Sequence, residues 1–169
     1  AGADVVLISA ARLPAPRGAR CVAVDSAQQM CDAVLAESAA ADALIMAASV
    51  ADFRPAQVST GKLKKSDGVP VIELVRNMDI LEKIAGQRST TGYPLLVVGF
   101  AAETHDLLEN ARTKLQKKAL NMIVANDISA SDAGFAVETN RVTLLIEDGT
   151  EESLPLMSKV EVSARIIEW

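Results

Sequence analysis

The sequence predicts an α/β domain with a mainly parallel sheet, on three observations. Apolar residues make up 50% of the 169 residues but aromatic residues only 3%, a composition typical of parallel strands covered by helices. Apolar runs of strand length alternate with helical patterns. Three of these runs end in small or polar residues near positions 47, 99 and 125, at the sheet edge where open α/β sheets bind ligands. We therefore expect a three-layer, Rossmann-like fold in one domain with a single core.

The first elements lie close to the start of the chain. Residues 3–9 are expected to form a strand, and no Met precedes them, so we expect the natural chain to begin earlier and an amino-terminal strand to be missing. A loop rich in proline, glycine and arginine leads to a second short strand at 21–24. Ser26 and Gln29 then have the spacing of a capping box, which predicts a helix to about residue 39.

The run from Leu44 to Pro55 is the centre of the expected fold. It begins as a buried strand and continues into four small residues, at positions 47, 48, 49 and 51, which leave room for a flat ring or a phosphate to approach the backbone. Asp52 then offers a carboxylate to a ribose hydroxyl or a metal ion. The lysines of the cluster at 61–65 have the reach to contact polyphosphate. The alternative is a strand followed by a solvated basic turn.

Two elements follow the basic cluster. Residues 69–75 alternate moderately and contain Pro70, which predicts an edge strand and a candidate dimer contact. A short helix is expected over 80–86, and Asp79 suits its positive amino terminus. The free amide groups of that terminus suit a phosphate equally well.

The second half repeats the strand–helix alternation. A strand at 95–100 is followed by a helix that Thr104 is expected to cap. Lys114 and Lys118 project from one face of this helix, either toward an anion or as a solvated face that offsets the helix dipole. A strand at 121–127, a hairpin over 140–154 and a closing helix complete the chain. That last helix starts at the capping-box pair Ser158 and Glu161 and runs to Trp169.

Several functional classes are disfavoured by composition. A net charge of −5 argues against broad binding of nucleic acid or anionic membranes, and neither a membrane span nor a signal peptide is found. Phosphate-loop and dinucleotide glycine fingerprints are absent. His105 is the single histidine and is expected on a helix surface. Cys21 and Cys31 show no metal or redox spacing and are expected to be buried, reduced thiols of a cytoplasmic protein.

An ordered series of motifs resembles the phosphopantothenoylcysteine synthetase domain, the carboxyl-terminal half of the bacterial bifunctional coenzyme A biosynthesis protein. The resemblance spans nearly the whole chain, residues 1–169. Its motifs are Met46-Ala-Ala-Ser-Val-Ala-Asp-Phe-Arg-Pro55, Gly61-Lys-Leu-Lys-Lys65, Asn77-Met-Asp-Ile80, Val98-Gly-Phe-Ala-Ala-Glu-Thr104, Ala111-Arg-Thr-Lys-Leu-Gln-Lys-Lys118 and Ala125-Asn-Asp127.

The resemblance implies an acid–amine ligase. In that reaction the carboxylate of 4′-phosphopantothenate attacks CTP, with Mg²⁺, to give an acyl-cytidylate and pyrophosphate, and the amine of L-cysteine then displaces CMP. The family is dimeric. Its bacterial members carry a flavin-dependent decarboxylase in their amino-terminal half, and FMN is implied only if such a domain is fused upstream.

The resemblance also implies roles for individual residues. Lys62 matches the catalytic lysine, and Ala48 the position where the chain packs closely against the reacting centre. The nucleotide contacts match Ala51, Asp52, Phe53, Lys62, Met78, Asp79, Ile80, Leu81, Phe100, Lys114 and Lys118, and Asp52 is the tentative metal ligand.

The sequence departs from the family's common motifs at two positions, and two other functions are compatible with the predicted fold. Ser49 stands where the family commonly has Ala, and Met78 where it commonly has Pro. The family's first strand, Gly-rich loop and an asparagine that holds the acyl-cytidylate would precede residue 1. One alternative is a nicotinamide-dependent oxidoreductase on a similar sheet. The other is a non-catalytic nucleotide-binding module.

Overall fold

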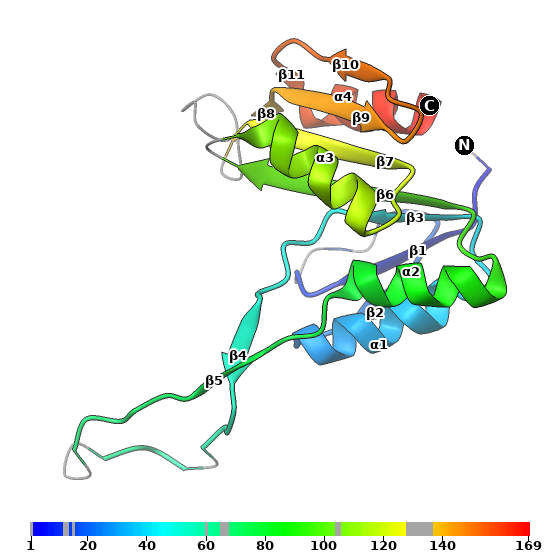
Figure 1. Cartoon of the computed structure of the whole chain (residues 1–169). Coiled ribbons are helices and arrows are strands. Elements are labelled where there is room, and N and C mark those ends of the chain that lie inside the picture. Colours follow the sequence, from blue (N-terminus) through cyan, green and yellow to red (C-terminus); the bar gives the residue numbers. More distant parts are fainter. Residues whose placement is uncertain are drawn as a thin grey trace. The chain divides into compact units, whose positions relative to one another are not determined.

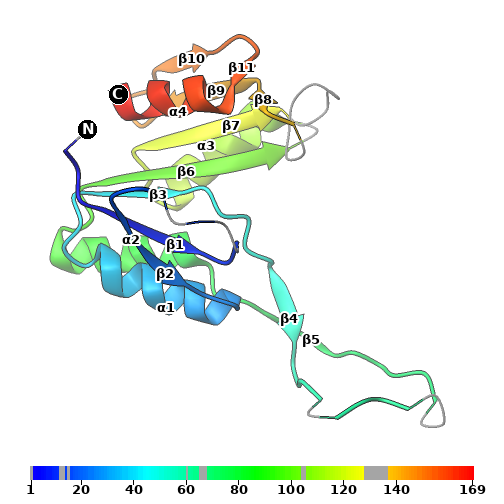
Figure 2. The ribbon, with the colours of Figure 1, turned by 180° about the vertical axis from the view of Figure 1, so that it is seen from behind.

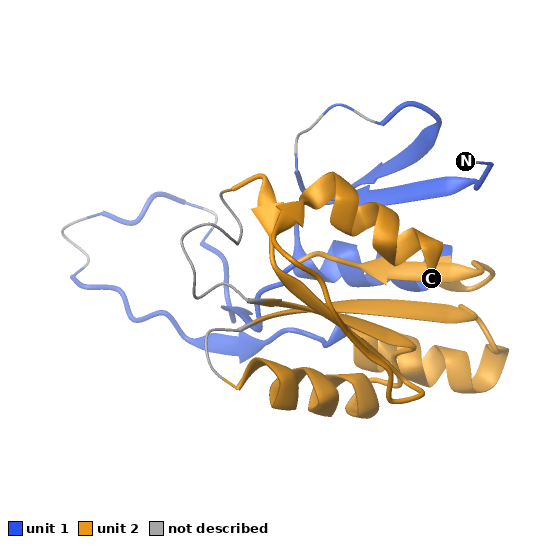
Figure 3. Ribbon diagram, turned by 90° about the horizontal axis from the view of Figure 1, so that it is seen from above, with its two compact units in different colours: residues 1–37, 49–80 blue, residues 38–48, 81–169 orange. Residues whose placement is uncertain are grey.

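Figure 1 shows the computed structural model of the chain, which describes residues 2–11, 14, 16–59, 61–64, 68–103, 106–127 and 137–169. The chain forms two compact units (Figure 3). Unit 1 comprises residues 1–37 and 49–80, and unit 2 comprises residues 38–48 and 81–169.

Unit 2 is built on a five-stranded sheet. The strand order is β10-β9-β7-β6-β3, formed by β3 (Ala43–Met46), β6 (Leu96–Glu103), β7 (Met122–Asp127), β9 (Val142–Ile146) and β10 (Glu151–Ser153). The strands β3, β6 and β7 are parallel, whereas β9 and β10 form an antiparallel hairpin. The expected α/β class with a mainly parallel sheet is therefore confirmed.

Helices cover both faces of this sheet. The helix α3 (Leu107–Lys117) lies over one face of β6 and β7, and α4 (Lys159–Glu168) lies on the opposite face (Figures 1 and 2). Because side chains alternate along a strand, Val98, Met122 and Val124 point toward α4, where they pack in one buried cluster with Val162 and Ile166. The expected capping box of α4 is present, with reciprocal bonds between Ser158 and Glu161. A short ladder of β8 (Thr139–Asn140) and β11 (Met157–Ser158) precedes it.

Gly99 lies on β6 where a Cβ atom would require the side chain of Leu120 to shift. A Cβ atom at this position would lie 2.7 Å from Cδ1 of Leu120 and 3.6 Å from Cδ1 of Leu81, which belongs to α2 (Ile80–Thr91). The missing side chain thus lets Leu120, at the approach to β7, fill the space over the middle of β6.

Unit 1 contains two separate strand pairs. The strands β1 (Val5–Ser9) and β2 (Ala19–Ala23) are parallel, and α1 (Ala27–Ser38) follows them in the chain. The strands β4 (Phe53–Pro55) and β5 (Leu74–Arg76) form a short antiparallel ribbon, visible at the lower end of Figure 1.

Four sequence-based expectations about elements are wrong in detail. The strand expected over 69–75 is regular only at Leu74–Arg76, and it pairs with β4 rather than with the main sheet, since Pro70 lacks an N–H for pairing. The helix expected over 80–86 continues through Gly86 to Thr91. The strand β3, which was expected to be buried, is an edge strand of its sheet, and Ile45 is 44% exposed. Cys21 is exposed on β2, although Cys31 is buried as expected, and neither cysteine is part of a disulfide.

The start of α3 differs from expectation as well. Its N-cap is Asp106, which has a left-handed backbone (φ 49°) and makes no side-chain capping bond. The expected cap Thr104 and the neighbouring His105 lie outside the described residues. None of the helices in the described part of the chain is long and apolar enough to cross a membrane.

Candidate functional site

The segment after β3 that carries Ala51, Asp52 and Phe53 belongs to unit 1 and is tied to the residues that precede α2. The backbone N–H of Asn77 donates to the carbonyl oxygen of Asp52 at 2.8 Å, and Nδ2 of Asn77 donates to the carbonyl oxygen of Ala51 at 2.7 Å. The register of β4 and β5 pairs Phe53 with Arg76. Asn77 therefore connects the predicted nucleotide-binding segment 51–53 to the predicted segment 78–81, which follows Asn77 in the chain.

Two arginines complete this arrangement. Nη1 of Arg54 donates to the carbonyl oxygen of Arg76 at 2.9 Å and to Oδ1 of Asn77 at 3.0 Å. The guanidinium of Arg76 lies 5.7 Å from the centre of the Phe53 ring, a cation–π distance. The side chain of Asp52 is exposed and its backbone oxygen is already bonded, so the carboxylate can accept hydrogen bonds from a ligand.

Lys62 lies in the long connection between β4 and β5 (Figure 1), and its side chain is exposed. This connection has no regular structure in its described part. The predicted catalytic lysine is therefore an exposed residue of an irregular connection in unit 1.

The residues predicted to bind phosphate lie at the beginning of α2. Met78 and Asp79 precede the helix, and Ile80 and Leu81 form its first turn. The first amide groups of a helix have no intrahelical acceptor, and they suit an anion. Ile80 is 4% exposed, so its buried side chain anchors this turn.

Ala48 and Phe100 belong to unit 2. Ala48 is exposed and follows the end of β3 by two residues, so its backbone stands at the carboxyl edge of the sheet. Phe100 pairs with Val124 in the middle of β6 and is half-buried against the cluster under α4. The ring of Phe100 therefore lies on the face of the sheet that α4 covers, and α3 covers the opposite face.

Lys114 and Lys118 lie at the other end of the strands. The N–H of Leu120 donates to the carbonyl oxygen of Leu115, and that of Asn121 to Val97 at the start of β6, so the last turn of α3 stands where β6 and β7 begin. Both lysines are half-buried on one flank of the helix, as the sequence predicted. The structure does not bring them to the carboxyl ends of β6 and β7, and their side chains lie on the opposite face of β6 from the ring of Phe100.

The expected Mg²⁺ can be tested against the donors available. Among the described residues, no group of three or more His, Cys, Asp or Glu side chains forms a metal cage. Mg²⁺ that acts on nucleotides is commonly held by one or two carboxylates together with substrate phosphates and water. The exposed carboxylate of Asp52 fits that mode, and it does not fit a metal ion held by protein alone.

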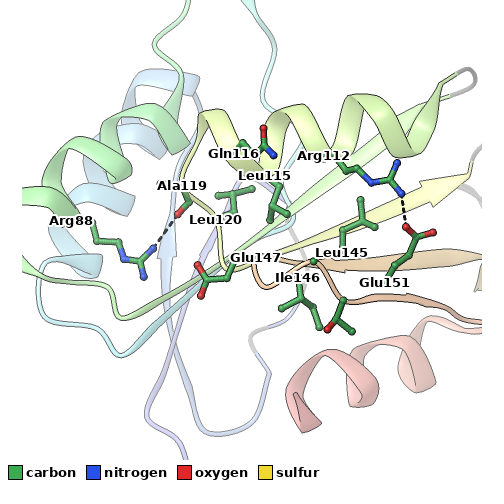
Figure 4. Close-up of a pocket in the computed structure, with 12 residues that line it drawn as sticks. Arg88, Arg112, Leu115, Gln116, Ala119, Leu120, Leu145, Ile146, Glu147 and Glu151 are labelled. Carbon is green, nitrogen blue, oxygen red and sulfur yellow. Dashed lines mark hydrogen bonds and ion pairs between the residues drawn. The ribbon is translucent and has the colours of Figure 1, made fainter.

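A pocket of about 400 Å³ in unit 2 contains none of the predicted site residues (Figure 4). Its apolar lining includes Leu115, Leu120 and Leu145, between α3 and the β9–β10 hairpin. Its charged groups are already paired. Arg88 donates to the carbonyl oxygens of Ala119 and Leu95, and Arg112 forms an ion pair with Glu151.

Sequence reasoning missed two polar residues. Asn77 appeared only inside a motif, and its partners lie more than twenty positions away in the chain, so no local pattern indicates its contacts. Asn126 is 8% exposed near the end of β7, and within the described residues its Oδ1 accepts no hydrogen bond. The only sequence feature that pointed to Asn126 was the polar end of the strand expected at 121–127.

The parallel sheet with helices on both faces and the small residues that follow β3 define a Rossmann-like α/β domain. The chain belongs to the DNA/pantothenate metabolism flavoprotein C-terminal domain family, whose model matches residues 1–169. This result confirms the resemblance found in the motifs.

Named relatives and solved structures agree with this assignment. The chain is 44% identical over 169 residues to the coenzyme A biosynthesis bifunctional protein CoaBC of Bacillus subtilis (strain 168), covering 99% of the chain and 41% of the relative. It is 46% identical over 176 residues to CoaBC of Mycobacterium tuberculosis (strain ATCC 25618 / H37Rv), covering 99% and 42%. A crystal structure of the CoaBC C-terminal domain superposes with a TM-score of 0.79 at 37% identity, covering 99% of the chain and 72% of that structure. The chain thus spans about two fifths of the length of these bifunctional relatives.

Proposed function

We propose that this chain forms a phosphopantothenate–cysteine ligase domain that uses CTP in coenzyme A biosynthesis. The observation that carries the proposal is the similarity to the CoaBC C-terminal domain over 99% of the chain. The choice of CTP and of the acyl substrate rests on the motif resemblance.

The proposed reaction has two steps. A carboxylate oxygen of 4′-phosphopantothenate attacks the α-phosphorus of CTP, which forms the acyl-cytidylate and releases pyrophosphate. The nitrogen of L-cysteine then attacks the acyl carbon, its proton passes to water or buffer, and CMP leaves. Activation is needed because a carboxylate is a poor acyl donor. No change in oxidation state occurs, so the reaction needs no redox cofactor.

The residues of unit 1 supply binding and charge stabilisation. Backbone groups of Ala51 and Phe53 bind the base, and Asp52 accepts from the ribose or holds the ion. Mg²⁺ bound there with the phosphates would offset their charge. Lys62 stabilises negative charge on the reacting phosphate and carboxylate, where a mobile point charge can follow the transition state.

Further contacts are proposed from the motif resemblance. The first turn of α2, at residues 78–81, binds the triphosphate through backbone amides. Ala48 leaves room at the reacting centre because its side chain is small. Phe100, Lys114 and Lys118 provide further nucleotide contacts by resemblance.

The connection between β4 and β5 suits a homodimer contact. Its apolar side chains are strongly exposed, with Val58 at 83%, Val69 at 94% and Val71 at 96%, and such exposed apolar surface marks protein interfaces. We include in the proposal that a second copy covers them and that a flavin-dependent decarboxylase is fused to the domain, as in the bifunctional relatives. Cytoplasmic location belongs to the same proposal.

The test begins with ligand binding. CTP with Mg²⁺ at about a hundredfold excess over its Kd should stabilise the folded protein by about 2.7 kcal/mol, whereas ATP should give a smaller shift. Pyrophosphate release with phosphopantothenate and cysteine then tests the reaction. No shift with CTP together with a clear shift with NAD would refute the ligase.

The catalytic role of Lys62 is tested in the same assay. Lys62→Ala should abolish pyrophosphate release while the melting temperature is retained, because the side chain is exposed and the charge is needed only in the reaction. Lys83→Ala, at another exposed lysine in α2, is the matched control and should keep wild-type turnover. Near-normal turnover by Lys62→Ala would remove this residue from the catalytic role.

A further inference from the structure

We propose that Asn77 is a positioning residue, which holds the backbone of Ala51 and Asp52 in the conformation that binds the nucleotide. The inference rests on the proposed function, because it concerns the same nucleotide site. It adds a residue whose side chain acts on the site through the backbone of its neighbours.

The first step of the argument is the geometry of one amide group. Nδ2 of Asn77 donates to the carbonyl oxygen of Ala51 at 2.7 Å, while Oδ1 accepts from Nη1 of Arg54 at 3.0 Å. A side-chain amide has both a donor and an acceptor. A carboxylate of the same shape keeps the bond to Arg54 but has no proton to donate to Ala51.

The second step is the place of these bonds in the chain. The β4–β5 ladder ends at the pair of Phe53 and Arg76. Beyond it, the backbone N–H of Asn77 donates to Asp52 at 2.8 Å, and the side-chain bond to Ala51 extends the connection by one more residue. The two peptide carbonyls before β4 are thus fixed by one residue, in a segment without regular pairing of its own.

The third step is the anchor of Asn77 itself. Arg54 binds Oδ1 of Asn77 and the carbonyl oxygen of Arg76 through the same nitrogen, Nη1, so the amide cannot rotate without losing a charge-assisted bond. This anchor orients Nδ2 toward Ala51. Asn77 also lies directly before Met78, so a displacement of Asn77 moves both nucleotide-binding segments.

The experiment uses Asn77→Asp in the full protein. The variant keeps an oxygen acceptor for Arg54 but places a carboxylate oxygen, which cannot donate, next to the carbonyl oxygen of Ala51. Loss of one positioning bond should raise the Kd and the KM for CTP about tenfold, measured by calorimetry and pyrophosphate release. Because the reacting atoms are untouched, kcat at saturating CTP should stay within about twofold of wild type.

The matched control is Gln57→Glu, which makes the same amide-to-carboxylate change at an exposed position in unit 1. The Kd of this control for CTP should stay within twofold of wild type, because the variant adds a negative charge but leaves the hydrogen bond to Ala51 intact. An equal rise in both variants would overturn the inference, because simple repulsion of the triphosphate would then explain the effect. An unchanged Kd in a folded Asn77→Asp variant would overturn it as well.

A second variant covers the case in which Asn77→Asp does not fold. Arg54→Met removes the anchor and leaves the donor of Asn77 in place, so the Kd for CTP should rise about threefold with little change in melting temperature. Wild-type affinity in this variant would contradict the inference. If the wild-type protein itself binds no CTP, the proposed function fails, whereas normal CTP binding with insensitive variants defeats only the role of Asn77.

Discussion

Two buried asparagines at the two ends of β7 provide a direct test of how this domain is stabilised. Asn121 precedes the strand and is 4% exposed, and Asn126 lies near its end and is 8% exposed. Oδ1 of Asn121 accepts from the N–H of Val97 at 2.8 Å, and its Nδ2 donates to Glu147 at 2.8 Å. Within the described residues, Oδ1 of Asn126 accepts no such bond.

The expected cost of truncation follows from these partners. Asn121→Ala leaves the buried N–H of Val97 without an acceptor, which costs about 1–3 kcal/mol, and loses a bond to Glu147 of about 1 kcal/mol. The sum is about 3 kcal/mol. For a domain of this size each kcal/mol lowers the melting temperature by about 2–4 °C, so Asn121→Ala should melt about 6–12 °C lower. Asn126→Ala should stay within about 1 kcal/mol of wild type.

Thermal and urea unfolding of the two variants, compared with wild type at the same protein concentration, measure this difference. The substitution is the same in chemistry and both asparagines are buried at or next to β7, so each variant is the control of the other. Equal destabilisation by Asn121→Ala and Asn126→Ala would refute the reasoning, since the amide of Asn126 would then be as well bonded as that of Asn121.

The remaining predictions concern the last turn of α3 and the cap of α4. Lys114→Ala and Lys118→Ala should each raise the Kd for CTP and reduce its salt dependence, while Lys117→Ala, at the exposed neighbour, should not; unaltered binding would restore the solvated-face interpretation. Hydrogen bonds from the hydroxyl and the backbone N–H of Ser158 hold the pKa of Glu161 below its ordinary value. Their stabilisation is therefore complete above the unfolded-state pKa of Glu161 and is lost as the pH falls through the lower folded-state value. Hydrogen exchange in α4 should show wild type and Glu161→Gln converging at acid pH, and a constant difference across that range would contradict this.

Much of the fold was predictable because its signals are local. The strands near 44, 95 and 121 are apolar runs that end in small or polar residues, and the capping box at Ser158 sets the start of α4 within four residues of sequence. These patterns reflect backbone periodicity and capping, which depend on neighbours along the chain. The α/β class and the order of the motifs follow from them.

Errors arose where distant contacts decide the structure. The alternating residues at 69–75 predicted one strand, but only the last part of this run pairs, and its partner is β4. The exposure of Cys21 and of Ile45 depends on which strands pair with β2 and β3 and which faces they leave open. No local pattern carries that information.

The sequence by itself determined the class of fold, the family and the residues that resemble a nucleotide site, because each is written in short motifs and periodicities. Only the tertiary structure decided which groups those motifs bring into contact. It joined Asn77 to Ala51 and Asp52, and it placed Lys114 at the end of the sheet where β6 and β7 begin. The physical reason is that hydrogen bonds and helix packing join residues that are close in space but are separated by twenty positions or more in the chain.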